Sequence, residues 1–138
     1  MAGVNADRAA IAALQEALDA AASAKDIDRF LSLFVDGPDF AFAFNGAVRT
    51  DLAEVRAFHV NAWADIVTLA FETSIERVAF PAGDIAVVAG IGRSRRTLKN
   101  GESRSGVYAL SLVVVRRPEG WRVLQAHEST PAPVPPPQ

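Results

Sequence analysis

The stretch GWRVLQAHEST, residues 120–130, alternates between two sets of side chains, and its interpretation decides the fold. Such alternation predicts a β-strand, because successive side chains of a strand point to opposite faces. One face begins with apolar groups and ends with an amide, an imidazole and a hydroxyl. We expect this strand to lie in a core at one end and to line a wet cavity at the other. That face comprises Trp121, Val123, Gln125, His127 and Ser129, and the opposite face comprises Arg122, Leu124, Ala126 and Glu128.

Upstream of this strand, apolar residues recur first with helical and then with strand periodicity. The pattern predicts helices from Asp7, over 27–34 and from Asp51 through Ile66, with a short strand over 39–46. It then predicts long strands over 67–80, 84–99, 102–117 and 120–129. Helices followed by a meander of strands indicate an α+β fold. We expect one domain over 7–130, with a disordered N-terminus over 1–6 and a proline-rich disordered tail over 131–138.

One predicted strand is apolar on both faces. The segment VYALSLVVVRR, residues 107–117, has no polar face, which is typical of a strand that is covered on both sides. The N-terminal helices can cover only one face of a curved sheet. A second copy of the same sheet is the simplest cover for the other face, so the sequence predicts a homodimer. Leu124 and Ala126 are the predicted interface residues.

Composition and charge exclude several classes of function. The chain has 138 residues, no cysteine and a net charge of −2, which excludes disulfides, thiolate metal sites and cysteine nucleophiles. The near-neutral charge gives no reason to expect nucleic acid or an anionic membrane as a partner. The N-terminus lacks the pattern of a signal peptide, and no apolar run approaches the ~18 residues of a membrane span. These features favour a cytoplasmic protein. No phosphate-binding loop or dinucleotide motif is present, so no cofactor is expected.

Several segments together resemble the nuclear-transport-factor-2-like superfamily, and within it the SnoaL-like and SgcJ/EcaC-type small proteins of bacteria. The segments are KDIDRFLSLF (25–34), the phenylalanine-rich strand (39–46), FHVNAW (58–63), GDIAVVAGIG (83–92) and GWRVLQAHES (120–129). The resemblance covers about residues 8–130. It implies a cone in which three N-terminal helices pack in a strongly curved, mostly antiparallel sheet with a pocket at the open end. Such relatives are usually dimers, and they include isomerases, dehydratases, cyclases and binding or scaffolding domains, so the fold alone does not define an activity.

The implied pocket has predicted apolar walls and a few predicted polar contacts. His59 and Trp63 lie one helical turn apart and face the same way. The predicted walls are Phe34, Phe42 and Trp63, and the predicted polar contacts are His59, Tyr108, Gln125 and His127.

The two histidines are the candidate catalytic residues, because an imidazole exchanges a proton near neutral pH. The alternative, that His59 and His127 are hydrogen-bonded to backbone or exposed, stays open. Two histidines fall short of the three protein ligands that zinc requires, so no metal is expected. Ketosteroid isomerases of the superfamily use an aspartate at a position that falls here on Phe42 or Ala43, and a tyrosine at a position near Leu18. Their mechanism is therefore not expected, and the pocket should lack a carboxylate.

The basic stretch GRSRRTLK, residues 92–99, has two interpretations. Alternation sends Arg93 and Arg95 one way and Arg96 the other, without fixing which side faces the pocket. One arginine could bind an acidic group at the pocket mouth, or all of them could be solvated on a hairpin.

The sequence thus favours a protein that binds a small, largely apolar molecule. One alternative is an isomerase, cyclase or dehydratase that acts on a polyketide-like or steroid-like compound through a pocket histidine. The other is a dimeric scaffold.

Overall fold

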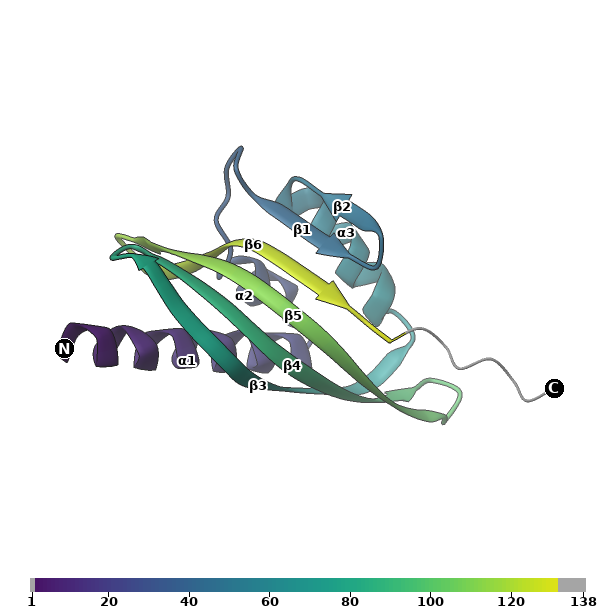
Figure 1. Ribbon diagram of the computed structural model, residues 1–138. Coiled ribbons are helices and arrows are strands. Elements are labelled where there is room, and N and C mark those ends of the chain that lie inside the picture. The colour runs from purple at the N-terminus through teal and green to yellow at the C-terminus, as the bar shows by residue number, and fades with distance from the viewer. Residues whose placement is uncertain (1, 132–138) are drawn as a thin grey trace.

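The computed structural model describes residues 2–131, which form three helices and one six-stranded curved sheet (Figure 1). The helices are α1 (Ala2–Ser23), α2 (Ile27–Leu31) and α3 (Leu52–Trp63). The strands are β1 (Ala41–Phe44), β2 (Ala47–Arg49), β3 (Ile66–Ala82), β4 (Ile85–Leu98), β5 (Ser103–Arg117) and β6 (Gly120–Ser129). None of the helices in this range combines the length and hydropathy needed to cross a membrane. Nearly all of the predicted tail, residues 132–138, lies outside the described residues.

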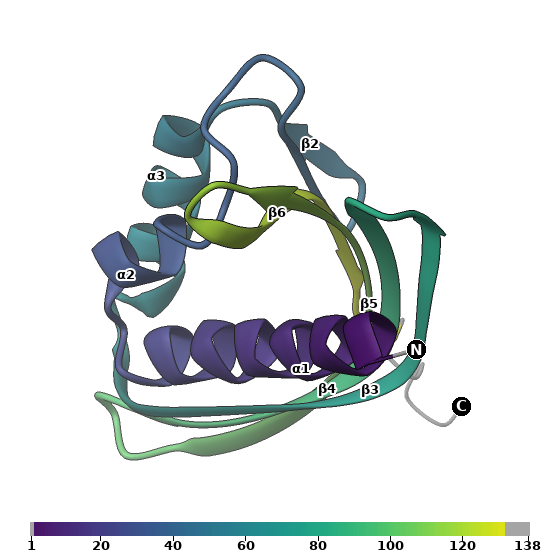
Figure 2. The ribbon, with the colours of Figure 1, turned by 90° about the vertical axis from the view of Figure 1, so that its left-hand side faces the viewer.

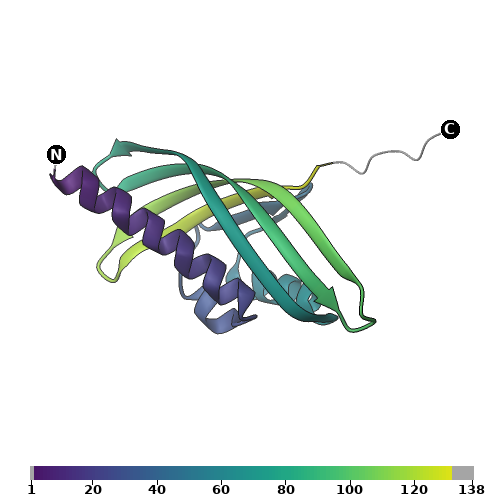
Figure 3. The same cartoon turned by 90° about the horizontal axis from the view of Figure 1, so that it is seen from below.

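The sheet wraps around the helices, which confirms the predicted cone-shaped α+β fold. Its strand order is β2-β1-β6-β5-β4-β3, and every neighbouring pair is antiparallel except β1 and β6. In Figure 2, α1 crosses the inner side of β3 and β4, while α2 and α3 lie across from the bend of the sheet. Seen from below, α1 runs alongside β3 at one edge of the sheet (Figure 3). The helices therefore cover only the concave face.

The predicted start of the first helix is wrong. Helix α1 begins at Ala2 rather than at Asp7, so residues 2–6 are helical. Asp7 does not cap the helix: its carboxylate pairs with Arg116 at 2.8 Å. Alanine is frequent through this segment and has the highest helix propensity, which lets the helix extend past Asp7.

Helix α1 also covers the free edge of the sheet. Strand β3 is the last strand, so part of its backbone has no neighbouring strand. Asp19 Oδ2 accepts a hydrogen bond from Thr73 N at 2.9 Å, and Ser23 Oγ accepts one from Phe71 N at 2.8 Å. These helix side chains satisfy edge amides that would otherwise be available to another strand.

The predicted start of the third helix is confirmed. Asp51 is the N-cap of α3, and its Oδ1 accepts a hydrogen bond from Glu54 N at 2.8 Å. Glu54 in turn accepts one from Thr50 N at 3.1 Å. These bonds satisfy amides at the start of the helix, which has no earlier turn to bond to.

A β-bulge in β6 breaks the alternation read from the sequence. Val123 pairs with Val114 of β5, but the next pair is Gln125 with Val113, so Leu124 is an extra residue. An extra residue reverses which face the following side chains occupy. The predicted orientation of Gln125 and His127 toward the concave face is therefore wrong, and both are exposed on the convex side.

The same bulge turns two residues inward. Ala126 is only 1% exposed and belongs to the core, so its predicted place in a dimer interface is wrong. Glu128 also points into the cone, where it lines a cavity. The bulge lies where β6 exchanges partners: Val123 is bonded to the segment after α2, and Gln125 begins the pairing with β1.

Candidate functional site

A small cavity lies inside the cone, and we call it the inner chamber. Its volume is about 60 Å³. A water molecule needs roughly 10–15 Å³ of such space, so the chamber can hold a few waters or a small chemical group. It is lined by Gln15, Leu18, Asp19, Ala22, Phe30, Phe34, His59, Trp63, Phe71, Tyr108, Leu110, Leu112, Ala126 and Glu128.

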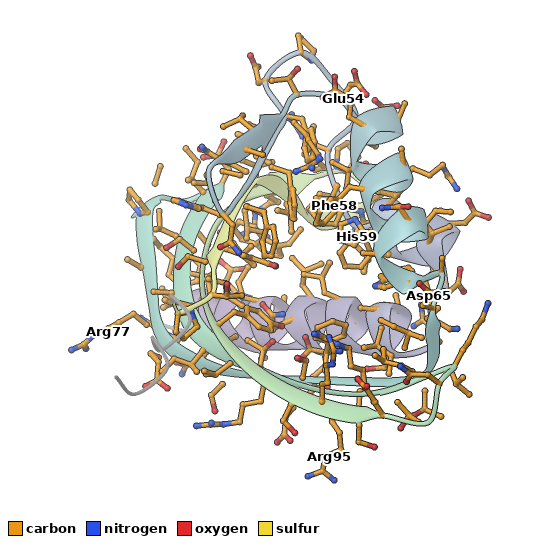
Figure 4. The ribbon with its side chains drawn as sticks, turned by 90° about the vertical axis from the view of Figure 1, so that its right-hand side faces the viewer. Glu54, Phe58, His59, Asp65, Arg77 and Arg95 are labelled. Carbon is orange, nitrogen blue, oxygen red and sulfur yellow. The ribbon has the colours of Figure 1, made fainter. Side chains whose placement is uncertain are left out.

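A larger hollow of about 460 Å³, which we call the vestibule, adjoins the inner chamber. His59, Trp63, Phe71, Tyr108 and Glu128 line both hollows and form the neck between them. Figure 4 shows that Phe58 and His59 point from α3 toward the middle of the cone. The vestibule has the size of a small-molecule site, whereas the chamber admits only the tip of a ligand.

Glu128 is the acid at the neck. Within residues 2–131 its carboxyl group has no side-chain hydrogen-bond partner. Burial, together with the negative charge of Asp19, raises the pKa of Glu128 to about 7. A carboxyl group with this pKa can accept or donate a proton near neutral pH.

Asp19 is the second carboxyl group of the chamber, and it is held by three hydrogen bonds. Its oxygens accept from Thr73 N at 2.9 Å, from Thr73 Oγ1 at 2.8 Å and from Gln15 Nε2 at 3.2 Å. Burial raises its pKa and these bonds oppose the rise. Three donors favour the ionised form of Asp19, and no side-chain donor within residues 2–131 favours that of Glu128, so Glu128 is the carboxyl group that holds a proton more readily.

His59 is a neutral imidazole whose Nε2 has no hydrogen-bond partner among residues 2–131. Its Nδ1 lies 2.8 Å from the carbonyl oxygen of Val55, and a carbonyl can only accept, so Nδ1 carries the hydrogen. Burial and then the charge of Arg49 lower the pKa of His59. Nε2 is left as a hydrogen-bond acceptor. Four rings surround the imidazole, with centroids 4.9–5.6 Å away: Phe30, Phe42, Phe58 and Trp63.

Tyr108 supplies a hydroxyl group at the neck. Its ring packs edge-on against Phe71, with centroids 6.1 Å apart. Burial, and then the nearby carboxylate of Glu128, raise the pKa of Tyr108, so the phenol stays protonated.

The structure brings four of the predicted site residues together and separates the others. Phe34, His59, Trp63 and Tyr108 line the inner chamber. Phe42 is buried behind His59, with ring centroids 5.6 Å apart, and does not line either hollow. The bulge puts Gln125 and His127 outside both hollows.

The expectation of a pocket without a carboxylate is wrong. Asp19 shares a helix face with Gln15, four residues earlier. This spacing was the signal in the sequence from which a polar group inside the pocket could have been predicted. Glu128 gave no signal, because simple alternation assigns it to the outer face.

The arginines of β4 divide between the two faces. Arg96 lines the vestibule together with Arg104 and Asp65. Arg93 and Arg95 are exposed on the convex side, and Figure 4 shows Arg95 pointing away from the cone. In residues 2–131, no group of three or more histidine, aspartate and glutamate side chains is placed to hold a metal ion.

The fold is that of nuclear transport factor 2-like proteins. A superfamily member from Salmonella enterica matches 96% of this chain and 96% of its own, with a TM-score of 0.80 and 16% identity. A ketosteroid isomerase-like protein from Erwinia carotovora matches 91% and 96%, with a TM-score of 0.77 and 19% identity. A type 2 hexachlorocyclohexane dehydrochlorinase matches 94% and 88%, with a TM-score of 0.81 and 16% identity. At these identities the likeness shows the fold alone.

The model of the SnoaL-like domain matches residues 11–133, and the chain belongs to this family. This confirms the resemblance seen in the sequence. No curated protein sequence matches the chain significantly.

Proposed function

We propose that this protein binds a small, largely apolar molecule in the vestibule, with one end of the molecule in the inner chamber. The observation that carries the proposal is the neck, where His59, Trp63, Phe71, Tyr108 and Glu128 line both hollows. The rings of Trp63, Phe71 and Tyr108 favour a ligand with an apolar body. The few polar groups at the neck fix the orientation of that ligand.

Binding can be tested with N-phenyl-naphthylamine, an uncharged fluorescent compound, and an obstructed vestibule. Ala62 lines the vestibule and is exposed, so Ala62→Trp adds bulk there without crowding the core. We expect the variant to bind the compound at least about tenfold more weakly, because the ring occupies its space. Ala57→Trp is the matched control, since Ala57 is exposed on the same helix but lines neither hollow. Absence of binding to the wild type would support a scaffold instead.

A second candidate function is proton transfer on the bound molecule. It is favoured by the Glu128 carboxyl, whose pKa is about 7, and by the free Nε2 of neutral His59 at the same neck. Two of the structurally similar proteins are named as a dehydrochlorinase and as isomerase-like, and both names describe reactions in which a proton moves.

Nitrobenzisoxazole tests this candidate without knowledge of the natural substrate. A base removes its ring C–H proton while the N–O bond breaks, which gives a coloured cyanophenolate. We expect the rate to rise through about pH 7, as Glu128 loses its proton. Glu128→Gln should lower the rate at least about tenfold, whereas His127→Gln should leave it unchanged. Equal rates for Glu128→Gln and wild type would exclude Glu128 as the base.

A further inference from the structure

Within residues 2–131, two acidic side chains and no lysine or arginine line the inner chamber. The acidic side chains are those of Asp19 and Glu128. His59 carries no charge, because burial lowers its pKa. The charge of the chamber is therefore negative and is not compensated by any side chain that lines it.

Gln15 adds a hydrogen-bond acceptor that receives no hydrogen bond from the described residues. The residue is 7% exposed and lines the chamber. Its Nε2 donates to Asp19 Oδ1 at 3.2 Å and to Thr73 Oγ1 at 3.4 Å, which fixes the orientation of the amide. Its Oε1 is buried and has no partner in residues 2–131. A buried acceptor of this kind is satisfied when a ligand brings a donor.

The polar groups deepest in the chamber all accept hydrogen bonds. Gln15 and Asp19 are the polar residues that line the chamber but not the vestibule, and both offer only acceptors there. The groups that can donate are the hydroxyl of Tyr108, the indole of Trp63 and the protonated carboxyl of Glu128, and all three lie at the neck. A ligand that reaches the deep end therefore needs a donating group.

Aromatic rings form much of the remaining wall. Phe30, Phe34, Trp63 and Phe71 line the chamber, and the faces of such rings attract cations. The volume of about 60 Å³ suits a small cationic head but not a bulky one.

We propose that the inner chamber binds the ammonium group of a small, largely apolar amine, between Gln15 Oε1 and the carboxylates of Asp19 and Glu128. The inference rests on the proposed small-molecule function and names its ligand class. The ammonium donates a hydrogen bond to Gln15 Oε1, which otherwise receives none within residues 2–131. Its positive charge also balances the acidic groups of the chamber. The apolar body of the amine lies against the rings at the neck and in the vestibule.

The proposal makes amine binding dependent on pH. The titratable and charged groups that share a hollow with Glu128 come from several elements. Asp19 of α1, His59 of α3 and Tyr108 of β5 line the inner chamber with it, and Asp65, Arg96 of β4 and Arg104 of β5 line the vestibule with it. Glu128 changes charge near pH 7, since burial and the charge of Asp19 raise its pKa to about that value. Its ionisation increases the attraction for a cation, so amine affinity should rise between pH 6 and pH 8.

Calorimetric titration with naphthylmethylamine and naphthylmethanol tests the proposal, because the two compounds differ only in the amino or hydroxyl group. At pH 7.5 we expect the amine to bind at least about tenfold more tightly than the alcohol. Glu128→Gln should remove most of this preference for the amine and its pH dependence. Glu76→Gln is the matched control, because Glu76 is exposed on β3 and lines neither hollow.

Three results would overturn the proposal. If the wild type binds the amine and the alcohol equally well, the inner chamber is not an ammonium site, but the proposed small-molecule site still stands. If Glu128→Gln still binds the amine more tightly than the alcohol, the ammonium does not bind beside Glu128. Failure of both compounds to bind would reject the proposed function and this inference with it. Should Glu128→Gln fail to fold, Gln15→Met, which removes the unpaired acceptor, must weaken the amine selectively.

Discussion

The phenol ring of Tyr108 lies directly against the backbone of Gly92, the residue opposite it on β4. A Cβ atom built on Gly92 would be 2.0 Å from Tyr108 Cζ, far inside van der Waals contact. Gly92 is therefore what allows the tyrosine to lie across the sheet and reach the neck of the cavity.

Gly92→Ala should displace Tyr108 and destabilise the fold by about 1–3 kcal/mol, because the new methyl group overpacks the site. Urea unfolding of Gly92→Ala, Tyr108→Ala and the double variant measures the coupling. The double variant should lose less free energy of unfolding than the two single variants lose together. Gly83→Ala is the control, since nothing lies within 4 Å of a Cβ there. Strict additivity would contradict this account.

The bulge in β6 predicts opposite environments for two neighbouring residues. The chain has no cysteine, so His127→Cys and Glu128→Cys each introduce a single thiol. We expect a bulky maleimide to label the first at least about tenfold faster, because His127 is exposed and Glu128 points into the cone. Ser129→Cys and Ala126→Cys extend the comparison to the exposed and buried faces. Similar rates at all four positions would refute the bulge.

Glu128 should make the protein less stable as pH rises. Its pKa is raised from 4.5 to about 7 in the folded chain, so the folded state binds the proton more tightly than the unfolded state. The associated stability is complete below about pH 4.5 and is lost as pH rises through about 7.

Urea titrations at pH 5 and pH 8 measure this loss. Glu128→Gln should exceed the wild type in stability at pH 8, by up to about 3 kcal/mol for a shift of this size, and should show little difference at pH 5. Glu76→Gln should behave as the wild type at both values. A wild type that is equally stable at both would contradict the raised pKa.

His59 should titrate below its ordinary value of 6.5, because burial and Arg49 disfavour its charged form. Proton NMR of the ring hydrogens can follow the two histidines of the chain, and His59→Phe assigns the resonance. Since the folded pKa is depressed, the stability that neutral His59 provides is present above pH 6.5 and declines on acidification. A midpoint at or above 6.5 would contradict the buried, neutral imidazole.

The convex face of the sheet is expected to meet a second copy of the chain. Val87, Ile91 and Val107 are 38–39% exposed on this face, on two adjacent strands. We expect light scattering to give a dimer, and Val107→Glu to give a monomer because it places a charge in the contact. Val60→Glu, at an exposed valine on α3, should leave the dimer intact. A monomeric wild type would contradict the expectation.

The sequence by itself determined the secondary elements and the side of most side chains. Its apolar periodicity predicted the three helices and the long strands, because burial of one face imposes a repeat of 3.6 or 2 residues. His59 and Trp63 were found for the same reason: their spacing of one helical turn fixes a common direction.

Only the tertiary structure decided which end of β6 lines the cavity. Periodicity assumes a regular ladder, and a single extra residue at Leu124 reverses every later side chain without altering the pattern of letters. That reversal removed His127 from the site and supplied Glu128. Glu128 and Asp19 are 109 positions apart in the sequence, and they come together only because the curved sheet brings β6 over α1. Burial inside the cone, and then the charge of Asp19, raise the pKa of Glu128.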